Sequence, residues 1–240
     1  MKKLVLIGAL LTTKLLVAQA PEYDDLRILY ADGDYEKLVR ASEKYTMNDK
    51  TKSDPLPHMW MGRGLYKVSL SGTDDEKYKN AYKEAIGEVG KSIKYDKDGS
   101  VQAEYAEFFE EFTNSLVETI RNEIDVKDYK KANTWILKYY KINLKSVGAK
   151  YLDGVCKYRN SDKGGANTAW KEADNMLKTV SDINDWSKAE KDMLMMGVIQ
   201  TAECYLSSKQ TEKAKAVMGK VAQWYEGNED FKAKYDEIVN

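Results

Sequence analysis

Proline is almost missing from this chain. Only 3 of its 240 residues are proline, and none follows Pro57. Because proline removes a backbone hydrogen-bond donor and breaks helices, a long stretch without it is free to be helical throughout. Alanine, lysine, glutamate and leucine dominate the same stretch and favour helices. The sequence therefore predicts an all-α protein.

Histidine and cysteine are nearly as scarce. His58 is the only histidine, and Cys156 and Cys204 are the only cysteines. A histidine base would have to be His58, and no serine, cysteine or carboxylate group has a spacing that names a reaction. Zinc sites usually gather histidine and cysteine ligands, which this chain does not supply in clusters. We therefore expect a protein that is not an enzyme and uses no metal or other cofactor.

An excess of charge of either sign is also lacking. The chain has 38 basic and 39 acidic side chains, so no overall field selects a nucleic acid. After the first residues, no run is long and apolar enough to span a bilayer. We expect no nucleic-acid partner and no transmembrane segment in the mature protein.

The beginning of the chain has the pattern of a secretory signal peptide. Residues 1–18 carry Lys2 and Lys3 ahead of an apolar run at 4–11 and end in small residues. Cleavage is expected after Ala18 or Ala20, which leaves a single domain at 21–240. No cysteine lies near the cleavage site, so no lipid anchor is expected. These features predict export, with the periplasm as the compartment.

Small and large apolar residues recur in a fixed pattern along the chain. Ala85, Val89 and Ser92 follow the spacing A-x3-F-x2-A, and Trp60 and Gly64 stand four residues apart upstream. The same two motifs return near the end of the chain, at Val198, Ala202, Tyr205, Ala214, Met218 and Val221. Similar inter-helix turns are predicted at 32–38 and 126–132. Self-similarity of this kind indicates a repeat architecture.

These motifs resemble the tetratricopeptide repeat (TPR), a helix–turn–helix unit of about 34 residues. The resemblance implies a right-handed α-solenoid of about five helix pairs with a short C-terminal capping helix. The expected pairs are 22–31 with 34–46, 56–71 with 75–96, 100–124 with 127–145, 147–160 with 165–181, and 187–208 with 210–226, followed by the cap at 229–238. Within 100–124, a four-residue recurrence of apolar residues from Phe108 to Ile124 predicts the buried face.

The resemblance also implies a partner-binding groove lined by the first helix of each pair. The positions that would face it are His58, Met61, Leu65, Val117, Arg121, Ile199 and Glu203. The function implied is a protein-binding adaptor or scaffold, here in a cell-envelope assembly or secretion machine. Abundant lysine, tyrosine and asparagine, with glutamine after the leader, resemble exported proteins of Bacteroidota. The alternative is a soluble helical-repeat protein that binds glycans or nutrients.

Aromatic and charged side chains each have two interpretations. Trp60, Trp135 and Trp170 could stack on sugars, although we expect them to fill the seams between helix pairs. Acidic residues dominate 101–125, whereas basic residues dominate 126–163. These two segments either neutralise one another, which we favour, or form a bipolar surface that orients a partner.

The two cysteines occupy matching positions in the fourth and fifth repeats if the repeat register is correct. Each follows a small residue, Gly154 or Ala202, by two positions. Export would place both thiols where disulfides form. The sequence leaves two arrangements open, a Cys156–Cys204 disulfide or two buried free thiols.

Overall fold

The computed structural model describes residues 23–72 and 75–240, which form α-helices joined by turns and two short 3-10 helices. The predicted signal peptide lies outside these residues. In chain order the α-helices are α1 (Asp24–Ala31), α2 (Tyr35–Met47), α3 (Pro55–Leu70), α4 (Ala81–Tyr95), α5 (Ser100–Glu104), α6 (Ala106–Asp125), α7 (Tyr129–Tyr139), α8 (Val147–Arg159), α9 (Lys163–Leu177), α10 (Lys188–Ser207), α11 (Thr211–Gly219) and α12 (Glu229–Val239). The all-α prediction is confirmed.

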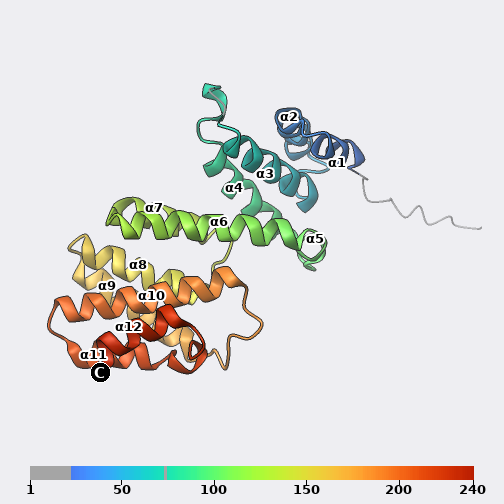
Figure 1. Ribbon diagram of the computed structural model, residues 1–240. Helices are drawn as coiled ribbons and strands as arrows, with labels where there is room; N and C mark the ends of the chain where they lie inside the picture. The colour runs from blue at the N-terminus through green and yellow to red at the C-terminus, as the bar shows by residue number, and fades with distance from the viewer. Residues whose placement is uncertain (1–22, 73–74) are drawn as a thin grey trace, which may run out of the picture.

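The helices are stacked as successive pairs along an elongated molecule. Figure 1 shows α1–α4 at one end, α6 and α7 in the middle, and α8–α12 at the other end. The five pairs are α1 with α2, α3 with α4, α6 with α7, α8 with α9, and α10 with α11. Helix α12 packs against α10 and α11 and closes the array. Within the described part of the chain, no helix is both long and apolar enough to cross a membrane.

Four of the five pairs share the same turn between their helices. In each, one residue adopts the left-handed conformation: Gly33, Lys127, Ser161 or Lys209, with φ between 58° and 74°. The next residue donates its N–H five positions back, as from Asp34 to the Leu29 carbonyl at 3.0 Å. This is the Schellman motif, which satisfies the last carbonyls of a helix. The repeat predicted from side chains is thus also present in the backbone.

Several predicted helix boundaries were wrong. The helices expected at 75–96, 127–145 and 210–226 are shorter, as α4, α7 and α11. The segment 100–124 is two helices, because Tyr105 between them leaves the helical conformation and its ring packs 5.3 Å from that of Trp60. The helix expected to begin at residue 165 begins instead at Lys163, as α9. The reason is Asp162, whose Oδ1 accepts the Gly165 N–H at 2.8 Å and so caps the helix.

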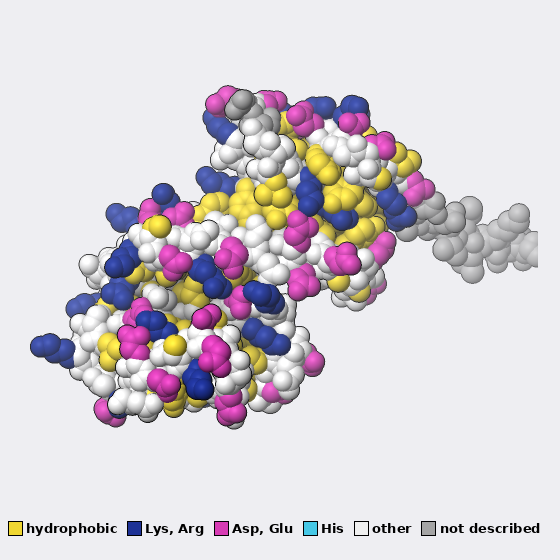
Figure 2. Space-filling model, viewed as in Figure 1, with side chains coloured by type: hydrophobic (Ala, Val, Ile, Leu, Met, Phe, Trp, Pro, Cys, Tyr) yellow, Lys and Arg dark blue, Asp and Glu magenta, His cyan; other side chains and the backbone are white. Residues whose placement is uncertain are grey.

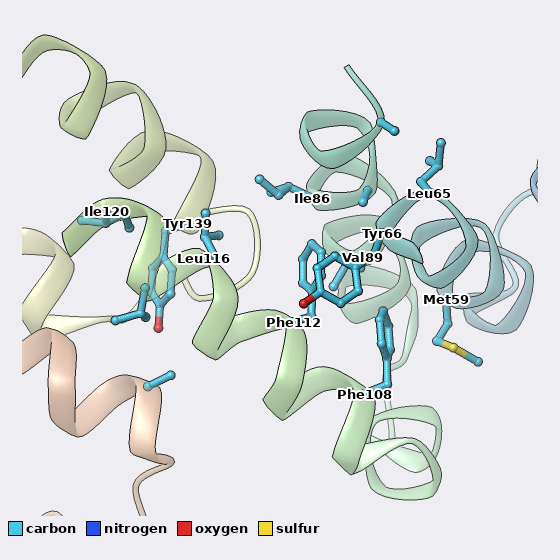
Figure 3. Packing of buried hydrophobic residues seen from close by; sticks show 14 of the residues in the cluster. Met59, Leu65, Tyr66, Ile86, Val89, Phe108, Phe112, Leu116, Ile120 and Tyr139 are labelled. Atoms are coloured by element: carbon cyan, nitrogen blue, oxygen red, sulfur yellow. The ribbon is translucent and has the colours of Figure 1, made fainter. Parts of the chain in front are cut away.

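Helix α6 carries the apolar face that joins the first helix pairs to the rest. Phe108 and Phe112 point toward α3, where Tyr66 meets Phe112 edge-to-face at 5.1 Å (Figure 3). Further along the same face, Leu116 and Ile120 lie toward Tyr139 of α7 (Figure 3). All of these side chains are buried, as the four-residue periodicity predicted. Burial of such large apolar side chains is the main contribution that stabilises the packing of α6 against its neighbours.

Glycines allow a close crossing between α8 and α10. A Cβ added at Gly148 would lie 2.3 Å from the backbone carbon of Met193. One added at Gly197 would lie 2.8 Å from the Gly148 carbonyl oxygen. The two glycines therefore face each other and let the helix backbones touch. In the second pair Gly62, rather than the Gly64 of the sequence motif, faces the partner helix α4, since its Cβ would meet Val89 at 2.7 Å.

The acidic and basic segments do not neutralise one another through ion pairs. Carboxylates of the acidic segment pair outside the basic one, as with Glu111 and Lys67 at 2.9 Å. Basic-segment lysines likewise find other partners, as Lys150 does with Glu172 at 3.0 Å. In the described residues, no ion pair joins the two segments. The favoured interpretation is therefore corrected, and several lysines of α7 and the turn after it remain unpaired.

Candidate functional site

A cleft lies where three helices from distant parts of the chain meet. The C-terminal end of α6 faces the middle of α10, and α12 closes one side. We call this the α6–α10–α12 cleft. Its volume is 330 Å³. The lining residues are Arg121, Ile124 and Asp125 of α6, Met195, Met196, Ile199, Gln200 and Glu203 of α10, and Asp230 and Lys234 of α12.

Helical periodicity explains why these residues share the cleft. On α10, Met195, Ile199 and Glu203 recur every four residues and so project from one face of the helix, with Met196 and Gln200 beside them. On α6, Arg121 and Ile124 are three residues apart and do the same. Helix α12 is held beside them by Phe231 and Ile238, which are buried against the last helix pair. The cleft thus depends on the packing of α12.

Aliphatic and thioether groups form the apolar part of the cleft. Ile124 and Met195 are buried, whereas Met196 and Ile199 are half-buried and present part of their side chains. Methionine is flexible and polarisable, so it adapts to apolar partners of different shapes. This surface suits an apolar side chain of another molecule better than a small polar ligand.

Charged groups surround that apolar surface. Arg121 lies 3.5 Å from Asp192 and 3.6 Å from Glu118, and its side chain is 33% exposed. Its Nε has no hydrogen-bond partner among the described residues. Lys234 of α12 reaches Glu203 at 3.5 Å. Long, half-exposed ion pairs of this kind contribute little to stability and can exchange partners.

The structure brings together three of the seven residues predicted for a groove. Arg121, Ile199 and Glu203 line the same cleft. Met61 does not, since it lies at the seam of α2 and α3, with its sulfur 3.8 Å from the Thr46 hydroxyl. The other three residues belong to the interior.

For His58, Leu65 and Val117 the prediction is corrected, because all three side chains are buried. His58 is held on both sides of its ring. Nδ1 lies 2.6 Å from a Glu88 carboxylate oxygen, and Nε2 lies 2.9 Å from the Lys52 carbonyl oxygen. Leu65 and Val117 pack in the core that α3, α4 and α6 share. None of these side chains is available to a partner.

Sequence reasoning missed Met195, Met196 and Lys234. Only a capping role was predicted for α12. A capping helix packs one face on α10, and its polar residues next to that face then lie beside α10. The four-residue spacing of Met195 and Ile199 could have indicated that they share one face of α10. What the sequence did not contain was the approach of α6 to α10, which are separated by three helices along the chain.

Cys156 and Cys204 are free thiols in the structure, so the disulfide is not formed. Both side chains are fully buried. Burial raises the pKa of Cys156 to about 12 and that of Cys204 to about 11, because a thiolate is poorly solvated in an apolar interior. Of the two arrangements that the sequence allowed, the structure has the buried thiols.

Two of the three tryptophans considered as sugar platforms are buried. Trp60 and Trp170 lie in the core, and Trp135 is half-buried with its ring 5.8 Å from that of Tyr82. Figure 2 shows hydrophobic side chains gathered over α3 and its neighbours with basic groups among them. The guanidinium of Arg63 on α3 stacks over the Tyr30 ring at 3.9 Å and so covers one face of that ring.

Among the described residues, no cluster of His, Cys, Asp and Glu could hold a metal ion.

Comparison with solved structures gives a likeness in fold to a helical-repeat protein. No protein-family model matches the chain, and no curated protein is similar to it in sequence. A thermophilic TPR protein of Thermus thermophilus is similar with 16% identity and a TM-score of 0.34, over 91% of this chain and 99% of that one. The fold of this chain is defined by its own helix pairs and their repeated turns.

Proposed function

We propose that the chain is an exported adaptor that binds a segment of another protein in the α6–α10–α12 cleft. The observation that carries this proposal is the convergence of apolar groups with weakly paired charges from three helices in one preformed hollow. A preformed surface receives a partner segment with little reorganisation cost. The apolar groups would hold the partner, and the surrounding Arg121 and Glu203 would orient it.

Export is supported by the two lysines and the apolar run at the start of the sequence. The proposed compartment is the periplasm, and the proposed role is that of a scaffold in an envelope assembly or secretion machine. The rival function, glycan or nutrient binding, has less support because Trp60 and Trp170 are buried. We propose no catalytic role.

Site-specific photocrosslinking in intact cells tests the cleft. A photoreactive amino acid at Ile199 should crosslink to one or a few envelope proteins, and Arg121→Glu in the same chain should reduce that yield. A photoreactive residue at Lys171, on the exposed surface of α9, is the matched control. Equal crosslinking from both positions, or no effect of Arg121→Glu, would contradict the proposal. Retained sugar without a protein adduct would favour the rival.

A further inference from the structure

A second cleft, of different chemistry, lies between two helices that do not line the first one. Helices α4 and α7 are the second members of neighbouring pairs, and they approach each other at the turn after α7. The volume of this α4–α7 cleft is 530 Å³. Its lining residues are Gly87, Gly90, Lys91, Lys94, Leu137, Tyr140, Lys141 and Leu144.

Glycines give the cleft both its contact and its opening. A Cβ at Gly90 would lie 2.8 Å from the Lys141 carbonyl oxygen, so this glycine lets α4 touch the turn after α7. Gly87, one turn earlier on α4, has no atom within 4 Å of where its Cβ would be. Packing within this chain therefore does not require glycine there. Its effect is to leave the helix backbone uncovered at the cleft.

Large apolar side chains border the cleft and remain in solvent. Leu137 is 57% exposed and Leu144 is 80% exposed. Both are among the few large apolar residues that the described structure leaves this exposed. Such surface marks interaction sites more often than free protein surface.

All charge on the cleft lining is positive. Lys91 is the only lining lysine with an ion pair in the described structure, at 2.7 Å from Glu88. Lys94 and Lys141 have none, and no acidic residue lines the cleft. Lys138 lies beside them, and burial together with the charges of Lys141 and Lys83 lowers its pKa. The lysines thus repel one another, and an added negative charge would relieve that repulsion.

We propose that the α4–α7 cleft binds an acidic amphipathic segment of a partner protein. Leucine-like side chains of that segment would rest on Leu137, Leu144 and the bare backbone at Gly87. Its carboxylates would pair with Lys94 and Lys141. A free inorganic anion would leave the leucines uncovered, and a bilayer needs a broad surface rather than a hollow of this size. The proposal is independent of the α6–α10–α12 cleft.

Fluorescence anisotropy with a defined probe tests this. The probe is a short labelled peptide of leucine and glutamate at helical spacing, and its counterpart carries lysine in place of glutamate. The acidic peptide should bind, and its affinity should fall as the salt concentration is raised, since salt screens exposed charges. Lys94→Glu with Lys141→Glu should lower affinity by about tenfold or more, because both charges that orient the peptide are reversed.

The controls separate the site from net charge. Lys130→Glu with Lys171→Glu changes total charge equally, at exposed lysines outside the cleft, and should change affinity less than about twofold. Leu137→Ser with Leu144→Ser should also weaken binding, without unfolding, because both side chains are exposed. Gly87→Gln should fill the cleft and weaken binding while thermal stability is kept.

Three results would overturn the proposal. One is that the Lys94→Glu/Lys141→Glu and Lys130→Glu/Lys171→Glu proteins bind the acidic peptide with equal affinity. Another is equal binding of the acidic and the lysine peptide. The third is co-sedimentation with phosphatidylglycerol vesicles when the acidic peptide does not bind, which would assign the surface to lipid. Any of these results leaves the first cleft's crosslinking result unaffected.

Discussion

His58 of α3 lies 2.6 Å from Glu88 of α4, Nδ1 to carboxylate oxygen, inside the core. The other ring nitrogen faces the Lys52 carbonyl oxygen, which can only accept a hydrogen bond. The Glu88 carboxylate oxygen is also an acceptor, so the imidazole ring lies between two acceptor groups. The lone histidine of the chain thus links α3, α4 and the turn before α3, and the arrangement is structural.

Removing one member of this pair should cost stability in a pH-dependent way. Burial by itself would raise the pKa of Glu88, but hydrogen bonds from His58 and Lys91 outweigh it and lower that pKa. A carboxyl group whose pKa is lowered by folding stabilises the folded protein at pH values above its ordinary pKa. This contribution is lost as the pH falls through the pKa of the folded state. We expect Glu88→Gln to cost about 2 kcal/mol at neutral pH and less in acid.

Urea unfolding of both proteins between neutral and acid pH measures this difference. Glu84→Gln is the matched control, an exposed carboxylate on the same helix that should have little effect. A loss of stability in Glu88→Gln that stays constant with pH would count against an ionised Glu88 in the folded protein.

The left-handed turns predict opposite effects for one substitution at two neighbouring sites. Lys127 has φ of 61° in the turn, whereas Lys130 lies within α7. Lys127→Gly should stabilise by up to about 1 kcal/mol, since glycine avoids the left-handed penalty. Lys130→Gly should destabilise by about 1 kcal/mol, because glycine is a poor helix former. Thermal melting compares them, and the same sign for both would refute the repeated turn.

The glycine contact between α8 and α10 should tolerate no added methyl group. Gly148→Ala would place a Cβ against the Met193 backbone, which cannot move aside as a flexible side chain would. We expect a loss of about 1–3 kcal/mol or more from overpacking. Gly87→Ala, in open space on α4, should instead stabilise by about 0.5–1 kcal/mol. Calorimetry that finds both changes neutral would show that the crossing is wider than described.

The buried thiols should be unreactive until the chain unfolds. Burial of Cys156 and Cys204 raises both thiol pKa values, so little thiolate is present at neutral pH and alkylation is slow. Protein isolated without reductant should take up little reagent when folded and two equivalents per chain in denaturant, by intact-mass measurement. No uptake in denaturant would mean that a disulfide forms in the natural compartment.

The helices themselves could be predicted from the sequence because their causes are local. Missing proline, the four-residue recurrence from Phe108 to Ile124, and turn residues such as Gly33 act within a few positions along the chain. Boundaries were less certain where a distant contact decided them. Tyr105 separates α5 from α6 because its ring packs on that of Trp60, which lies 45 positions earlier in the chain.

The sites could be predicted only in part, for the same reason. The TPR resemblance placed Arg121, Ile199 and Glu203 in a groove, and they do share one cleft. It also placed His58 on a surface, although a carboxylate on another helix buries it. Periodicity shows which residues share a face of one helix. It does not show what covers that face.

By itself, then, the sequence determined the all-α class, the succession of helix pairs and the turns between them, since these depend on local backbone preferences and apolar spacing. Only the tertiary structure decided which faces remain open. The meeting of α6 with α10, the bond from the Tyr139 hydroxyl to Glu190, and the contact of Gly90 with the turn after α7 join residues far apart in the chain. Both clefts exist because of such contacts, which follow from how whole helices pack.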